Sequence, residues 1–172
     1  MAKHGKAAQP PGEHLVQELL WVHGILRRDL RVIRQLADEV TAGSSGARVN
    51  NKIRSLRTQS PLWQLRSNCL RYCSFVHAHH GGEDASLFPA LRRADRSLGP
   101  TVDRLEADHR KVSDLLDQVQ ALADLLGSDD GPETRGRLAD ALRELAKHLL
   151  EHLDFEEKSI SPTLRRWHRW PW

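Results

Sequence analysis

The sequence contains one pattern twice: AHHGGEDASLFPALRR from Ala78 to Arg93, and EHLDFEEKSISPTLRR from Glu151 to Arg166. Aligned without a gap, His79 corresponds to His152 and Glu83 to Glu156, and each glutamate follows its histidine by four residues. That spacing places an imidazole and a carboxylate on one face of a helix, about one turn apart, where both can ligate one metal ion. Two such helices facing each other would enclose a two-metal centre.

The rest of the chain is also typical of amphipathic helices, because apolar residues recur at steps of three and four. The predicted helices run from 13 to 41, from 61 to a stop or kink at Pro89, from about 100 to 126, and from a turn at 127–132 to near Pro162. Short connections between them predict an all-α fold, an up-down-up-down four-helix bundle in residues 13–164. A disordered leader (1–12), a polar basic connection (47–59) and a Trp- and Arg-rich tail (165–172) complete the expected organisation.

The composition argues against a nucleic-acid-binding protein and against a membrane-spanning one. The chain of 172 residues is long enough for one domain, and its net charge of +3 is weak support for a nucleic-acid partner, so we expect none. No stretch has the length and apolarity of a signal peptide or a membrane span. Cys69 and Cys73 are four residues apart, a spacing that suits neither a zinc CxxC pair nor a disulfide, and we interpret them as reduced thiols of a cytoplasmic protein.

Histidine is the outlier of the composition, with ten residues, and each predicted helix carries one on its apolar stripe. A single inward histidine is more often a satisfied core residue, but four on four helices beside two inward glutamates indicate a ligand set. Buried ionised carboxylates are costly unless they are paired or bind a metal. Imidazole with carboxylate suits iron, manganese or zinc. The predicted metal ligands are His23, His79, Glu83, His109, His152 and Glu156.

The second helix allows two registers for its ligand pair. His80 and Asp84 are also four residues apart and could replace His79 and Glu83, but the internal repeat favours the latter pair. The glycines at 81 and 82 are unfavourable inside a helix, so we expect a neighbouring helix to approach closely there.

These residues resemble the hemerythrin-like, or HHE cation-binding, domain. The matching motifs are His23 alone, HHGGED, EADH with His109, and EHLDFEE. The resemblance implies two iron ions with an oxo or hydroxo bridge and both glutamates bridging, with zinc or manganese as alternatives. It also implies a non-haem protein that binds or reacts with O2, NO or peroxide. The alternative is an oxygen, redox or iron-sensing module without turnover, and whether the chain is an enzyme stays open.

The chain departs from oxygen-carrying members of that family at two ligand positions. They have His-x4-Asp on the fourth helix, where this chain has His-x3-Glu at His152 and Glu156. They carry a second histidine four residues after the first on the third helix, where this chain has Ser113. We therefore expect one metal to lack an imidazole, with Tyr72, His148 or a shifted His80 as additional ligands or near-ligands. An incompletely filled position favours redox chemistry over reversible O2 carriage.

The C-terminal residues RRWHRWPW alternate arginine with tryptophan. Such a tail could contact a protein partner, a membrane surface or nucleic acid. The alternative, which we favour, is that the tryptophans fold back over one end of the bundle and cap the mouth of the metal site.

Overall fold

The computed structural model describes residues 9–42 and 61–172. The predictions of a disordered leader in residues 1–8 and of a connection in residues 47–59 lie outside the described residues. Within the described part, no helix is long and apolar enough to cross a membrane.

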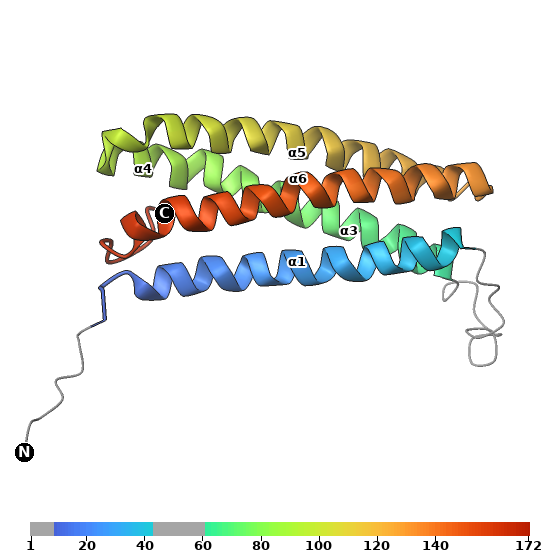
Figure 1. Ribbon diagram of the computed structural model, residues 1–172, viewed down its shortest axis with the longest axis horizontal. Coiled ribbons are helices and arrows are strands. Elements are labelled where there is room, and N and C mark those ends of the chain that lie inside the picture. Colours follow the sequence, from blue (N-terminus) through green and yellow to red (C-terminus); the bar gives the residue numbers. More distant parts are fainter. Residues whose placement is uncertain (1–8, 43–60) are drawn as a thin grey trace, which may run out of the picture.

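Four long helices form the bundle: α1 (Glu13–Thr41), α3 (Pro61–Gly82), α5 (Gly99–Leu125) and α6 (Pro132–Leu164). Successive helices run in opposite directions, and α1 and α5 each pack against both α3 and α6 (Figure 1). The described residues contain no strand. The prediction of an all-α, up-down-up-down bundle is confirmed.

The second helix continues past Pro89, so of the two predicted outcomes, a stop or a kink, the stop is wrong. A π-helical turn, η2 (Glu83–Leu87), follows α3 directly, and α4 (Phe88–Ala94) follows the π turn. Pro89 has no N–H, so it cannot donate the α-helical hydrogen bond to the backbone carbonyl four residues earlier. A wider π turn precedes it, and the helix continues instead of ending. A short 3-10 turn, η3 (Arg96–Leu98), then leads into α5.

The apolar core is divided into two clusters along the bundle axis. On α1 one cluster ends at Leu19 and the other begins at Leu26, and on α6 the corresponding residues are Ile160 and Leu153. The two clusters are separated in the same way on the second helix, between Val76 and Leu87, and on α5, between Leu105 and Val112. The predicted metal ligands lie in this gap on each helix, except His152, which directly precedes Leu153. The bundle therefore contains one buried polar layer between two apolar cores.

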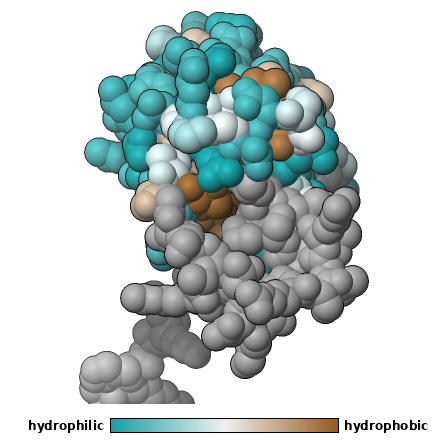
Figure 2. Space-filling view, turned by 90° about the vertical axis from the view of Figure 1, so that its right-hand side faces the viewer, coloured by the Kyte–Doolittle hydropathy of each residue, from teal (hydrophilic) through white to brown (hydrophobic). Residues whose placement is uncertain are grey.

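Both ends of the described chain meet at the end of α6. The backbone N–H of Gly12 donates to the carbonyl of Arg165 at 3.1 Å, and Glu13 pairs with the Arg165 side chain at 2.9 Å. Trp167 and Trp170 pack against the apolar cluster at this end of the bundle. The tail therefore folds back onto the bundle, as the favoured alternative predicted. The opposite end is largely hydrophilic, with small apolar areas between the helices (Figure 2).

Candidate metal centre

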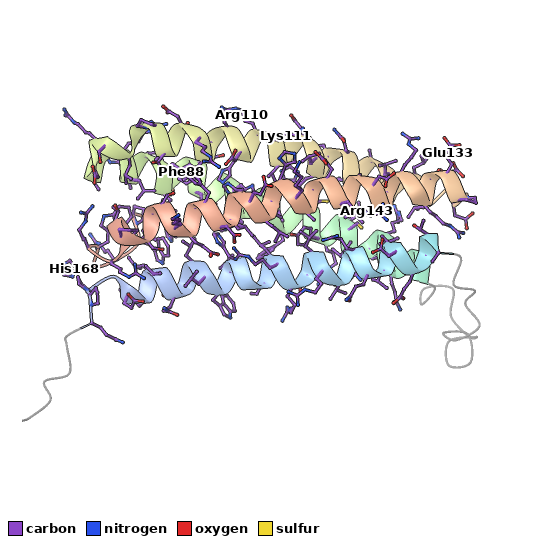
Figure 3. The ribbon with its side chains drawn as sticks, viewed as in Figure 1. Phe88, Arg110, Lys111, Glu133, Arg143 and His168 are labelled. Atoms are coloured by element: carbon purple, nitrogen blue, oxygen red, sulfur yellow. The ribbon has the colours of Figure 1, made fainter. Side chains whose placement is uncertain are left out.

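The polar layer takes side chains from every long helix. His109 points inward from α5, whereas its neighbours Arg110 and Lys111 lie on the outer face of the bundle (Figure 3). Phe88 borders the layer, and its ring stacks on that of His109 with the two centroids 5.0 Å apart. The members of the layer are buried, or nearly so, and they are His23, His79, His80, Glu83, His109, His152 and Glu156.

These residues form overlapping groups whose ligand atoms lie within 4.8 Å of one another. One group consists of three imidazoles, those of His80, His109 and His152. A second consists of His23, His79 and Glu83, and a third joins Glu83 to His109 and Glu156. Glu83 and His109 each belong to two groups, so the layer is one continuous set of potential ligands.

Each of the two glutamates lies between imidazoles of different helices. The Oε1 atom of Glu83 lies 3.3 Å from Nε2 of His79, and its Oε2 atom lies 3.6 Å from Nε2 of His109. The Oε2 atom of Glu156 lies 3.5 Å from Nε2 of His23 and 3.6 Å from Nε2 of His152. Each carboxylate thus faces imidazoles from both sides, an arrangement that suits a carboxylate shared by two ions.

Two further acids orient the histidines from outside the layer. Nδ1 of His109 donates to Asp84 at 2.8 Å, and Nδ1 of His23 donates to Glu157 at the same distance. Arg27 also donates to Glu157. With Nδ1 protonated, each ring presents the lone pair of Nε2 to the layer, which is the form that ligates a metal.

Burial favours the neutral forms of the histidines and glutamates of the layer. Burial lowers the pKa of His79 to about 3 and that of His109 to about 2, so the imidazoles stay neutral. Burial and the neighbouring Glu156 raise the pKa of Glu83, and burial with the nearby Glu157 raises that of Glu156 to about 8. Bound metal ions would stabilise the ionised form of both glutamates, which neutral imidazoles cannot do.

Unpaired polar atoms point to the same conclusion. Several buried atoms of the layer have no hydrogen-bond partner, and they are Nε2 of His23, His79 and His80, Nδ1 of His152, Oε2 of Glu83 and both carboxylate oxygens of Glu156. Buried polar atoms are rarely left without a partner. Nitrogen and oxygen donors converging in this way match the preferences of iron, manganese and zinc.

The structure brings all six residues predicted as ligands into one layer, and it adds His80. The ring of His80 stacks on that of His109, with centroids 3.9 Å apart and planes 8° apart. The expectation that one metal lacks an imidazole stays a prediction, while His80 brings a fifth imidazole into the layer, beside those of His109 and His152. Successive side chains on a helix point about 100° apart, so His79 and His80 belong to different groups of ligand atoms.

Tyr72 and His148 do not join the ligand set. The Tyr72 hydroxyl donates to the carbonyl of Leu26 at 3.2 Å, its ring belongs to an apolar cluster, and burial raises its pKa. His148 pairs with Glu144 at 2.9 Å near the surface. The predicted close approach at Gly81 and Gly82 is also wrong, because a Cβ atom at either position would meet no neighbour within 4 Å.

Sequence reasoning missed the roles of Asp84 and Glu157, although the repeat contains a signal for them. Each follows directly after the glutamate of its copy, so the aligned pattern is HxxxE followed by a second acid. Helical spacing pairs Asp84 with His80, whereas in the structure Asp84 holds His109. The cysteines are both buried free thiols, as the sequence predicted.

Comparison with known proteins agrees with this ligand set. The family profile of the hemerythrin HHE cation-binding domain matches residues 14–164, which is nearly the whole chain. No curated protein and no solved structure gave a significant match.

Proposed function

The chain belongs to the hemerythrin HHE cation-binding family, and from that membership we propose that it is a non-haem di-iron protein whose centre binds or reacts with O2, NO or peroxide. Metal binding by a helical domain is the property of the family, and the His/Glu cluster of this chain agrees with it. What we propose beyond this family property is that the ions are two in number, that they are iron, and that they bind a small ligand.

The observation that carries the proposal is the position of Glu83 between His79 and His109. A carboxylate that faces two separate imidazole groups is suited to hold two ions together. Under this proposal His80, His109 and His152 hold one ion, and His23 and His79 hold the other. Glu83 and Glu156 would be shared between the two ions.

Two iron ions held in this way supply Lewis-acid and redox chemistry to a small ligand. The residues of the chain set the conditions for that chemistry. The apolar clusters on either side of the layer keep bulk water from entering along the bundle axis, and the Phe88 ring packs against that of His109. Asp84 and Glu157 hold two of the imidazoles in the tautomer that ligates a metal.

Metal analysis of the purified protein, together with its optical spectrum, tests the proposal. We expect two irons per chain and near-ultraviolet absorption from the ferric pair. In His109→Ala the iron content should fall toward one per chain and this absorption should be lost, whereas the control His148→Ala should retain both. Two zinc ions and no colour would overturn the iron assignment, and a single ion per chain would overturn the two-metal centre.

Peroxide consumption by the iron-loaded protein separates an enzyme from a binding or sensing module. Continued consumption over many equivalents indicates turnover, whereas a reaction that stops at about one equivalent indicates stoichiometric oxidation of the centre.

A further inference from the structure

A cavity of about 240 Å³ opens beside the metal layer. It lies where α1, the π turn and the C-terminal tail meet, and it is open to the surface. Its lining consists of Glu18, Leu19, Val22, His79, Gly82, Glu83, Leu87, Trp170 and Trp172.

The floor of this cavity is the metal layer itself. His79 and Glu83 both line it, and each has a buried polar atom without a hydrogen-bond partner. The other walls are mostly apolar, because they consist of two aliphatic side chains of α1, Leu87 and two indole rings. A molecule in the cavity would therefore contact apolar side chains around a polar floor, the usual composition of a small-molecule site.

The tail is a structured wall of the cavity. The indole N–H of Trp170 donates to the carboxylate of Glu18 at 2.6 Å, and the Trp170 ring stacks on that of Trp172 with centroids 4.8 Å apart. The tail is thereby tied to α1, next to the helix face that carries Leu19 and Val22. Trp172 remains 69% exposed, so its ring stands at the outer rim.

The lining also restricts the charge of a ligand. It includes two carboxylates, Glu18 and Glu83, and neither lysine nor arginine. An organic anion would find no cationic side chain to pair with, and a cation would lose its hydration against mostly apolar walls. Size sets a second limit, since an apolar cavity of about 150 Å³ already binds benzene in another protein.

We infer that this cavity is a binding site for a neutral, mostly apolar organic molecule of about ten non-hydrogen atoms, seated against His79 and Glu83. The centre would then serve a ligand larger than a diatomic gas. This inference rests on the proposed function for the metal ions that the ligand would meet beside His79 and Glu83. The binding itself depends on the apolar side chains that form the walls of the cavity.

Calorimetric titration of the full-length protein as purified tests the site, with benzyl alcohol as the neutral probe and benzenesulfonate as the anionic one. We expect benzyl alcohol to bind about tenfold more tightly than the sulfonate. Val22→Phe places a ring in the cavity and should reduce benzyl alcohol binding by about tenfold or more. The matched control is Val32→Phe, the same change on the same helix at a 46% exposed position outside this cavity.

Trp172→Ala provides a second test that spares the core, because this ring is largely exposed. Loss of one aromatic wall should weaken binding about three- to tenfold. Equal affinity for the two probes, or equal binding by the wild type, Val22→Phe and Trp172→Ala, would overturn the inference. Iron content is measured on the same samples. Missing iron with intact probe binding contradicts the proposed function alone, and intact iron with no probe binding contradicts the cavity inference alone.

Discussion

Asp84 accepts a hydrogen bond from Nδ1 of His109 at 2.8 Å, across the interface between the second helix and α5. The equivalent acid of the second copy, Glu157, holds His23 of α1 at the same distance. Each copy of the repeat therefore contributes a histidine and a glutamate to the layer and also orients the histidine of a helix that has no repeat. The duplicated sequence accounts in this way for ligands on all four long helices.

Removing Asp84 should weaken metal binding without unfolding the bundle. The carboxylate is 45% exposed, so Asp84→Ala leaves little unfilled space, but His109 loses the partner that fixes its tautomer. We expect about 10- to 100-fold weaker metal affinity, measured by competition with a chelator. The control is Asp117→Ala, which removes an aspartate paired with the outer histidine His77 at 3.3 Å. Equal affinity in the two variants would show that Asp84 has no part in orienting His109.

His80→Ala should lower the number of bound ions, because His80 is one of the three imidazoles of one group. We expect the metal-to-protein ratio to fall toward one, since His23, His79 and both glutamates remain for the second ion. His77→Ala, on the same helix but paired with a surface aspartate, should leave the ratio unchanged. A ratio of two metal ions per chain in both variants would show that His80 packs in the layer without binding a metal.

Helical phase explains how much of the centre is predictable from the sequence. The period of 3.6 residues sets the direction of each side chain from the local sequence, so the sequence alone places His23, His109 and the two HxxxE pairs on inward faces. Helical phase does not determine how far along the bundle axis a side chain lies. Tyr72 shares the face of His79 but lies seven residues earlier, about 10 Å along the helix, within an apolar cluster.

Other features depend on contacts between distant residues. His79 and His80 both reach the layer because the second helix faces two groups of ligands, which no single-helix pattern encodes. The π turn likewise depends on packing, since Pro89 is equally compatible with a helix stop. The place of Trp170 follows from its bond to Glu18, 152 residues earlier in the chain.

Gly12→Ala and Gly24→Ala should change stability in opposite directions. A Cβ atom at Gly12 would overlap the carbonyl oxygen of Leu164, so we expect a loss of about 1–3 kcal/mol in the free energy of unfolding. Gly24 lies inside α1 with no atom within 4 Å of such a Cβ, so alanine there should stabilise by about 0.5–1 kcal/mol. Chemical unfolding curves measure both, and a stabilising Gly12→Ala would contradict the close approach of the two chain ends.

Tyr72→Phe should affect stability and leave the metal centre unchanged. The hydroxyl bonds to the Leu26 carbonyl inside an apolar cluster, and its loss should cost about 1 kcal/mol. Metal content and the optical spectrum should match those of the wild type, because no phenolate reaches the layer. Loss of a visible absorption band in this variant would show that Tyr72 ligates a metal after all.

The metal-free protein should have a maximum of stability at near-neutral pH. Burial lowers the pKa of all five imidazoles of the layer, so the unfolded chain binds protons that the folded chain does not, and stability is lost as pH falls below the ordinary value of 6.5. Burial raises the pKa of Glu156 to about 8 from 4.5, so the folded chain keeps a proton that the unfolded chain has released. That contribution is lost as pH rises from 4.5 to about 8.

Imidazoles outnumber carboxylates in the layer, so the two effects place the maximum near pH 6.5, with a decline toward both 5 and 8. Bound metal ions should abolish the decline on the alkaline side, because they stabilise the ionised glutamates that oppose folding in their absence. Urea unfolding at about pH 5, 6.5 and 8, with metal-loaded and chelator-treated protein, measures the difference. A metal-free protein that is more stable at pH 8 than at 6.5 would show that Glu83 and Glu156 are not forced together in the layer.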